Sequence, residues 1–304
     1  MIGVLLDAVL PIFAVAALGF AAGRIGLFDN AMASIINRFV FYLPLPVLCF
    51  KLLANAPFEK FDWLLLSGYF LSEVAVYALG FLVARLAFKC GWRESILLGM
   101  AAAFSNHVLF VLPIALTLFG DGVTLPIVAI ITVDTLLIFG ATLLLMDILT
   151  LEKPSVTGLV IKLVKNPPVM GMASGLVFGS LGVDLPTGIN TFLDFVSTTA
   201  APCALFAMGV VLSDTTGSTR TALPVAISAL KVVGHPLLAV AVIVFGFEIS
   251  PETARPALMT AAGPCGAMAF VMALNYNVKV DAIARAILFA MIASVVTVTL
   301  MAAY

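Results

Sequence analysis

The sequence predicts an all-α membrane protein in which ten transmembrane helices form two inverted repeats of five helices. Three observations lead to this prediction: an apolar composition, ten apolar segments of membrane-spanning length, and a match between the two halves of the chain. Hydrophobic residues make up 63% of the 304 residues and charged residues 10%, whereas soluble domains have roughly 45–50% and 25%. So few charged side chains cannot cover a water-soluble globule, and the chain is expected to lie almost entirely within a lipid bilayer.

Ten segments have the roughly 20 mostly apolar residues that a transmembrane helix needs. These spans cover residues 4–25, 31–54, 62–88, 94–119, 123–148, 158–182, 188–212, 221–246, 252–275 and 282–302. The first segment carries Asp7 and no basic region, so it is predicted to be a membrane span and not a removed signal peptide. The links are short, so no soluble domain is expected.

Basic residues are distributed unevenly between the links. With the N-terminus outside, eleven of the fifteen Lys and Arg residues fall on the cytoplasmic side and only Lys51, Lys60 and Arg255 on the outer side. Cytoplasmic loops of membrane proteins are rich in Lys and Arg. Both termini are therefore predicted to face the periplasm.

A shift of 156 residues aligns the chain with itself. It places Pro11, Gly19, Gly23 and Gly26 of span 1 on Pro167, Gly175, Gly179 and Gly182 of span 6. The same shift places Pro46 on Pro202, and Asn106-His107-Val108 of span 4 on residues 262–264 of span 9. The repeats are predicted to cover residues 1–150 and 151–304 of one integral membrane unit. Because each has an odd number of spans, the second is inverted, which is typical of secondary transporters.

Four spans carry helix breakers near their centres. They are Pro44 and Pro46 in span 2, SNHVLFVLP ending at Pro113 in span 4, Pro202 in span 7, and GPCG at residues 263–266 in span 9. For Pro44, Pro46 and Pro202 a simple kink in a packed helix explains the sequence equally well. Spans 4 and 9 are expected to unwind at the midplane and to touch there, because both combine breakers with polar or small residues.

The unwound segments supply the candidate substrate-binding residues. The N-termini of half-helices offer free N–H groups and a positive dipole end, which suit a carboxylate. We therefore predict a substrate site formed by Ser105, Asn106, His107, Gly263, Pro264 and Cys265. His107 could relay a proton, or could be a neutral hydrogen-bond donor.

Ionisable residues inside spans complete the candidate set. Lys231 and His235 share one helix face in span 8, and Lys231 is predicted to bind the anion. The alternatives for Lys231 are a structural ion pair with Glu73 or Asp194, or a lysine that loses its proton. Glu73, His235 and Asp134 are candidates for coupling or support. Two plainer interpretations are that Thr132 and Thr135 hold Asp134 and that Asp194 lies at the outer interface.

The motifs SNHVLFVLPIAL in span 4, KVVGHP in span 8 and GPCGAMAFVMALNYNV in span 9 resemble the auxin efflux carrier family. That family includes bacterial permeases for malonate and other organic anions, and its fold is similar to bile-acid sodium symporters and sodium–proton antiporters. The resemblance implies that Asn106 contacts the substrate carboxylate and that Pro264 is the crossover proline of span 9. Plant auxin exporters have proline where His107 follows Asn106, and lysine where Tyr77 follows Glu73 by one turn, so a compact bacterial permease is the closer likeness.

The resemblance also implies a scaffold of spans 1, 2, 6 and 7 and a crossover part made of the other spans. Six glycines would let the scaffold helices approach closely: Gly19, Gly23, Gly26, Gly175, Gly179 and Gly182.

The expected function is secondary active transport of a small organic anion across a bacterial inner membrane by alternating access, linked to protons or to the membrane potential. A sodium-coupled symporter is the alternative, and an ion channel is less favoured. No HExxH, GxSxG, GxxxxGKS/T or GxGxxG motif occurs, and the four cysteines never have CxxC spacing. We therefore expect neither an enzyme nor a bound metal or cofactor. With a net charge of −1, nucleic acid is not an expected partner; a homodimer is left open.

Overall fold

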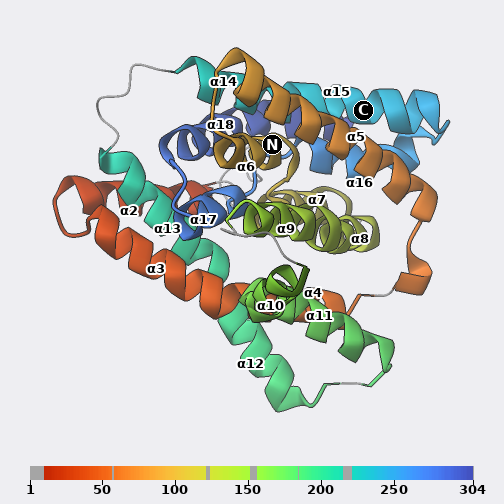
Figure 1. Cartoon of the computed structure of the whole chain (residues 1–304). Coiled ribbons are helices and arrows are strands. Elements are labelled where there is room, and N and C mark those ends of the chain that lie inside the picture. Colours follow the sequence, from red (N-terminus) through yellow and green to blue (C-terminus); the bar gives the residue numbers. More distant parts are fainter. Residues whose placement is uncertain are drawn as a thin grey trace.

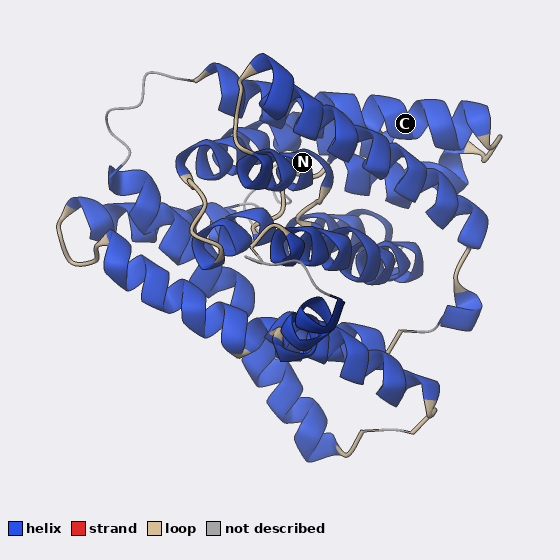
Figure 2. Ribbon diagram, in the orientation of Figure 1, coloured by secondary structure: helices blue, strands red, loops and turns tan. Residues whose placement is uncertain are grey.

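The computed structural model describes residues 10–56, 58–120, 124–150, 156–183, 185–214 and 221–303. Every regular element within these ranges is a helix, and none is a strand (Figure 1, Figure 2). Six helical stretches are long and apolar enough to cross a membrane: Asn30–Ala54, Trp63–Ala87, Leu125–Ile148, Thr187–Asp214, Ala222–Gly246 and Asp281–Met301. The prediction of an all-α, multi-pass membrane protein is thus confirmed.

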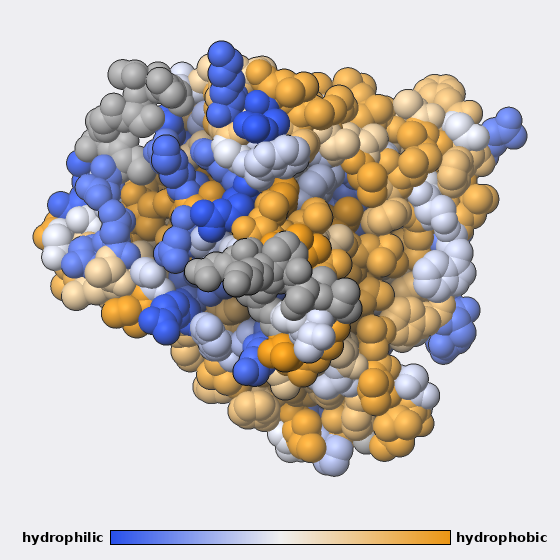
Figure 3. Space-filling view, viewed as in Figure 1, coloured by the Kyte–Doolittle hydropathy of each residue, from blue (hydrophilic) through white to orange (hydrophobic). Residues whose placement is uncertain are grey.

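Large apolar side chains cover much of the outer surface. Phe195 is 78% exposed and Phe245 72%, and Figure 3 shows broad hydrophobic areas over the helices of the visible face. In water such a surface would be an aggregation hazard, whereas lipid chains cover it without a penalty. This surface is therefore suited to a bilayer.

The helices form two groups that pack mainly within themselves (Figure 1). The small panel consists of α2 (Leu10–Arg24), α3 (Asn30–Tyr42), α4 (Pro44–Ala54), α11 (Pro167–Ser180), α12 (Thr187–Ser197) and α13 (Ala200–Asp214). The large panel consists of α5 (Trp63–Leu82), α6 (Trp92–Ala103), α7 (Leu112–Phe119), α8 (Thr124–Asp134), α9 (Gly140–Ile148), α14 (Ala222–Ala229), α15 (His235–Ala239), α16 (Pro251–Ala262), α17 (Met268–Asn275) and α18 (Asp281–Ala303). Contacts of α3 with α17 and of α13 with α18 join the two panels.

Glycines bring the helices of the small panel into backbone contact. α2 packs on α13 and α11 packs on α4. A Cβ atom on Gly19 would lie 2.1 Å from the carbonyl oxygen of Phe206, and one on Gly175 would lie 2.6 Å from that of Phe50. The predicted close approach is confirmed at these positions, and also at Gly23 and Gly179.

The same prediction is wrong for two of the six glycines. Gly26 and Gly182 have φ values of +74° and +61°, and nothing lies within 4 Å of a Cβ atom added to either. Each follows the end of a helix, where a left-handed residue turns the chain away from the helix axis. Their role is therefore to end α2 and α11, not to let helices approach.

The predicted span at residues 158–182 is wrong as a single helix. The chain forms α10 (Val156–Lys165) and α11, which are separated at Asn166. Proline disfavours a helical conformation in the residue before it and supplies no N–H to the preceding turn, so Pro167 and Pro168 start a new helix. Asn166 caps that helix by accepting a hydrogen bond from the backbone N–H of Val169 at 3.5 Å.

Spans 2 and 7 are interrupted next to their prolines. Leu43 separates α3 from α4, and Pro44 is the first residue of α4. Ser197 ends α12, and Pro202 lies in the first turn of α13. Proline is tolerated in a first turn because those N–H groups have no partner in the helix.

Wide π-helical turns recur in the large panel. They cover Val83–Ala87, His107–Val111, Thr135–Phe139, Leu230–Gly234 and Val240–Gly246. Such turns in other proteins are frequently found at functional sites. Two of them include residues of the candidate site, His107 and Lys231.

Candidate substrate site at the helix crossover

Two interrupted helices touch where the sequence predicts their breaks. α6 ends at Ala103 and α16 at Ala262, and the extended residues that follow pair in antiparallel fashion with Ser105 opposite Cys265. The backbone N–H of Gly266 donates to the carbonyl oxygen of Phe104 at 2.8 Å, and the N–H of Asn106 donates to that of Pro264 at 2.9 Å. These bonds satisfy backbone groups that helix formation would otherwise use. His107 was expected in the unwound segment but already belongs to the next helical turn.

Small residues make this contact feasible. A Cβ atom on Gly266 would lie 2.7 Å from the ring of Phe104, and one on Gly263 would lie 2.6 Å from Val111. The Ser105 hydroxyl donates to the carbonyl oxygen of Thr260 at 2.6 Å, which ties one segment to the other helix. Glycine and serine therefore allow and fix the crossing of the two chain segments.

Lys231 lies at the crossover and is fully buried. Its ammonium group contacts the carbonyl oxygens of Ala103 at 2.8 Å and Ala261 at 3.2 Å. The other two partners are the Ser105 hydroxyl oxygen at 2.5 Å and Nδ1 of His235 at 2.8 Å. Lys231 thus sits at the C-terminal ends of α6 and α16, where the helix dipoles favour a positive charge. The described residues include no ion pair of Lys231 with Glu73 or Asp194.

Two acidic side chains lie next to the crossover. Nε2 of His107 is 2.6 Å from Oδ2 of Asp134, and both side chains are buried. The interpretation that Thr132 holds Asp134 by a hydrogen bond is wrong, because the Thr132 hydroxyl donates to the carbonyl oxygen of Val128 instead. Glu73 is fully buried as well, and neither of its carboxyl oxygens receives a hydrogen bond from a described residue.

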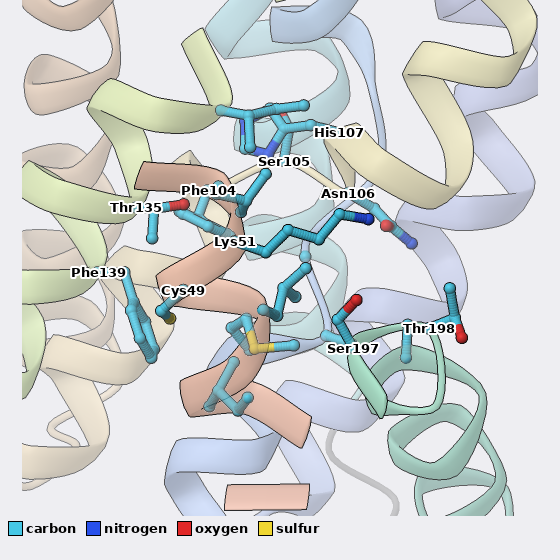
Figure 4. A pocket seen from close by; sticks show the side chains of 18 residues that line it. Cys49, Lys51, Phe104, Ser105, Asn106, His107, Thr135, Phe139, Ser197 and Thr198 are labelled. Carbon is cyan, nitrogen blue, oxygen red and sulfur yellow. The ribbon is translucent and has the colours of Figure 1, made fainter. Parts of the chain in front are cut away.

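A cavity of ≈ 210 Å³ opens beside the crossover, between the two panels (Figure 4). α4, the junction of α12 and α13, the residues around Thr135, and both crossover segments form its wall. Its polar lining residues are Lys51, Ser105, Asn106, His107, Thr135, Ser197 and Thr198. The volume is below the roughly 300–1,000 Å³ of pockets for drug-sized ligands, so it suits a small molecule.

The candidate residues divide according to this cavity. Of the candidates, Ser105, Asn106 and His107 line it, as does Gly266 from the break in span 9, whereas the described lining does not include Gly263, Pro264, Cys265, Lys231, Glu73, Asp134 or His235. Asn106 is 8% exposed, and its side-chain amide has no hydrogen-bond partner among the described residues. Of the predicted breakers, Pro44, Pro46 and Pro202 lie outside the described lining too, and the side chain of Pro113 lies outside the described part of the structure.

Lys51 is the charged lining residue that the sequence did not indicate, and Ser197 and Thr198 are further polar lining residues outside the predicted set. Lys51 lies in the last turn of α4, and Figure 4 shows its side chain extending across the cavity toward Asn106. Its ammonium group is 2.5 Å from Oδ1 of Asp194 on α12. The sequence offers no local signal for this role, because a lysine at the end of an apolar segment resembles an interfacial anchor.

A second polar cluster joins the two panels at the C-terminal ends of α9 and α17. The Tyr276 hydroxyl donates to Oδ1 of Asp147 at 2.8 Å, and the Asn166 amide donates to Oδ2 of Asp147 at 3.4 Å. Burial, together with the nearby Asp147 carboxylate, raises the pKa of the Tyr276 hydroxyl well above its usual value, so it remains a donor. Asp147 and Tyr276 belong to the large panel and Asn166 leads into α11, so the cluster holds the panels together here.

Known proteins match this chain along almost its whole length. The sequence model of the family described as "Membrane transport protein" matches residues 4–302. A Rhizobium meliloti (strain 1021) protein named "Putative malonate transporter" is 28% identical over 96% of this chain and 92% of its own. An "Uncharacterized transporter" of Methanothermobacter thermautotrophicus is 26% identical over 97% of this chain and 96% of its own. "Auxin efflux carrier component 8" of Arabidopsis thaliana is 21% identical over 96% of this chain and 94% of its own. The chain therefore belongs to the membrane transport protein family, the family of the auxin efflux carriers.

Proposed function

We propose that this chain is a secondary active transporter for a small organic anion that carries a carboxylate. One observation carries the proposal. The cavity at the crossover presents the open amide of Asn106 and the ammonium group of Lys51, and its described lining contains no Asp or Glu. An anion entering this space meets hydrogen-bond donors and the positive charge of Lys51, whose carboxylate partner Asp194 lies outside the described lining. The family relationship supports transport, and the relative named for malonate supports an organic anion.

We further propose that the chain crosses the membrane ten times as two inverted repeats. Support comes from the packing of the small panel. Gly19 contacts Phe206, and Gly175 contacts Phe50. The 156-residue shift converts the first pair into the second, since Phe206 is the counterpart of Phe50. An approximate two-fold relationship between the halves would produce such reciprocal contacts.

Alternating access would follow from movement of the large panel against the small one. The cavity is accessible near Lys51 and Asp194, whose side chains are 37% and 59% exposed. At the opposite end Asp147 is 2% exposed and holds Tyr276 and Asn166. By the charge distribution of the links, the accessible end faces the periplasm of a bacterial inner membrane. Residues 1 and 304, whose orientation the sequence analysis predicts, lie outside the described residues.

We propose that transport of the anion is coupled to protons or to the membrane potential. The buried carboxyl groups of Glu73 and Asp134, with His107 beside them, could bind a proton close to the substrate cavity. A sodium-coupled symporter is the competing mechanism.

Transport assays with the purified protein in liposomes would test both the proposed transport of an organic anion and its proposed coupling. We expect labelled malonate to exchange with internal malonate, and an imposed pH gradient or potential to drive its accumulation without sodium. Accumulation that requires sodium would replace the coupling proposal. Absence of exchange for every small carboxylate tested would overturn the transport proposal, and so would currents above any transporter turnover.

A further inference from the structure

Lys51, which lines the cavity, forms an ion pair with Asp194, which lies outside the described lining. The two side chains come from α4 and α12 of the small panel, and their charged atoms are 2.5 Å apart. Both remain substantially exposed, at 37% and 59%. Exposed ion pairs contribute little to stability because water competes for both charges. A carboxylate that arrives in the cavity can therefore replace Asp194 as the partner of Lys51.

The cavity has two separate groups that can receive a carboxylate. One lies at the crossover, where Asn106 precedes the helical turn of residues 107–111 and presents an amide that no described residue pairs with. The other is Lys51, which points toward Asn106 across the cavity (Figure 4). Apolar side chains, including Leu48, Leu52 and Phe139, line the remaining wall. Donors at two places around a small apolar space match a short molecule with an acidic group at each end.

We propose that Lys51 is a substrate-binding residue that gives the site its preference for short dicarboxylates, and that Asp194 occupies Lys51 when the site is empty. This inference rests on the proposed function and names the substrate class of the same cavity. Asn106 receives one carboxylate of the substrate and Lys51 the other. A monocarboxylate of equal size fills the cavity but leaves the Lys51–Asp194 pair intact.

The two partners of the ion pair should respond in opposite directions. Removing the charge of Lys51 removes the attraction for the second carboxylate. Removing the charge of Asp194 removes the competitor and leaves Lys51 free for the substrate. A purely structural ion pair would give effects of the same sign, because losing either partner breaks the same contact.

Calorimetric titration of the purified full-length protein with malonate and propionate would test the inference. These two ligands have three carbons each and differ by one carboxylate. We expect Lys51→Gln to weaken malonate binding at least tenfold and to change propionate binding less than twofold. We expect Asp194→Asn to strengthen malonate binding severalfold. Lys60→Gln, at an exposed lysine outside the described cavity lining, is the matched control and should change neither affinity.

Thermal unfolding of each variant verifies that the fold is intact. The double variant Lys51→Gln/Asp194→Asn, in which no ion pair can form, should bind malonate as weakly as Lys51→Gln does. Equal losses of malonate and propionate affinity in Lys51→Gln, or weaker malonate binding in Asp194→Asn, would overturn the role of Lys51 and leave the proposed function standing. If the wild-type protein bound no carboxylate, the proposed function would fail, and this inference would fail with it.

Discussion

The ammonium group of Lys231 lies 2.8 Å from the carbonyl oxygen of Ala103, the last residue of α6. An equivalent contact at 3.2 Å reaches Ala261, one residue before the end of α16. One buried cation thus neutralises the C-terminal ends of two interrupted helices that meet in the interior. This arrangement explains a lysine inside a membrane-spanning segment that has no ion pair among the described residues and is absent from the described cavity lining.

Replacing Lys231 should destabilise the crossover. Lys231→Met keeps a long side chain but leaves the carbonyl oxygens of Ala103 and Ala261 without their donor. Each buried polar group that loses its partner costs about 1–3 kcal/mol, so the thermal unfolding midpoint should fall clearly and substrate binding should be lost with it. Lys231→Arg should rescue poorly, because a planar guanidinium does not fit a site built around a compact ammonium group. A Lys231→Met protein with wild-type stability would contradict this role.

Asn106→Ala should weaken anion binding while leaving the fold intact. The side-chain amide of Asn106 has no protein partner among the described residues, so its removal strands no buried group. A lost hydrogen bond to a charged ligand costs about 1.5–3 kcal/mol, which corresponds to roughly tenfold or more in affinity. Titration with malonate measures the effect, and Asn190→Ala, on α12 and outside the described lining, serves as the control. Unchanged affinity would remove Asn106 from the site.

Gly19→Ala should destabilise the small panel. The added Cβ atom would lie 2.1 Å from the carbonyl oxygen of Phe206, so α2 and α13 would have to separate. Overpacking of this kind costs typically about 1–3 kcal/mol. Gly175→Ala should have a similar but smaller effect at 2.6 Å from Phe50, whereas Gly188→Ala meets nothing within 4 Å and should be neutral. Thermal unfolding in detergent compares the three variants, and equal midpoints would refute the close packing.

Glu73→Gln should remove the pH dependence of transport if protons drive it. A buried carboxyl group without hydrogen-bond donors gains stability by binding a proton, and glutamine imitates that protonated form. Malonate exchange in liposomes should then be independent of pH and unable to use a proton gradient. Glu59→Gln, at an exposed residue, is the control. Unaltered gradient-driven accumulation in Glu73→Gln would exclude Glu73 as the proton site.

The sequence predicted those features that local chemistry determines. Proline and glycine mark their own positions, so the interruptions near Pro44, Pro202 and Pro264 could be located from the sequence. Hydropathy over the whole segment was misleading at residues 158–182, because the polar and proline residues at 165–168 are too few to change its apolar character. These residues separate α10 from α11, so helix-breaking residues are better guides to a helix boundary than hydropathy is.

Apart from the contact between spans 4 and 9, side-chain contacts between distant residues could not be predicted from the sequence. A buried lysine suggests a carboxylate partner, but the partners of Lys231 include main-chain carbonyl oxygens, which every residue possesses. The sequence places Lys51 at the outer end of span 2, and only the packing of α4 against α12 brings it to Asp194. His107 and Asp134 likewise meet because two helices cross, not because of their spacing along the chain.

The wide π-helical turns, among the described residues, all belong to the large panel. A wide turn lengthens the path between hydrogen-bonded residues and lets a helix bend or shift register with little loss of bonding. The small panel instead holds its helices at backbone contact distance, with no room for such adjustment. The large panel thus contains turns that can change shape, whereas the small panel is packed too closely to do so. We therefore expect shape changes during a transport cycle to occur in the panel that carries the crossover.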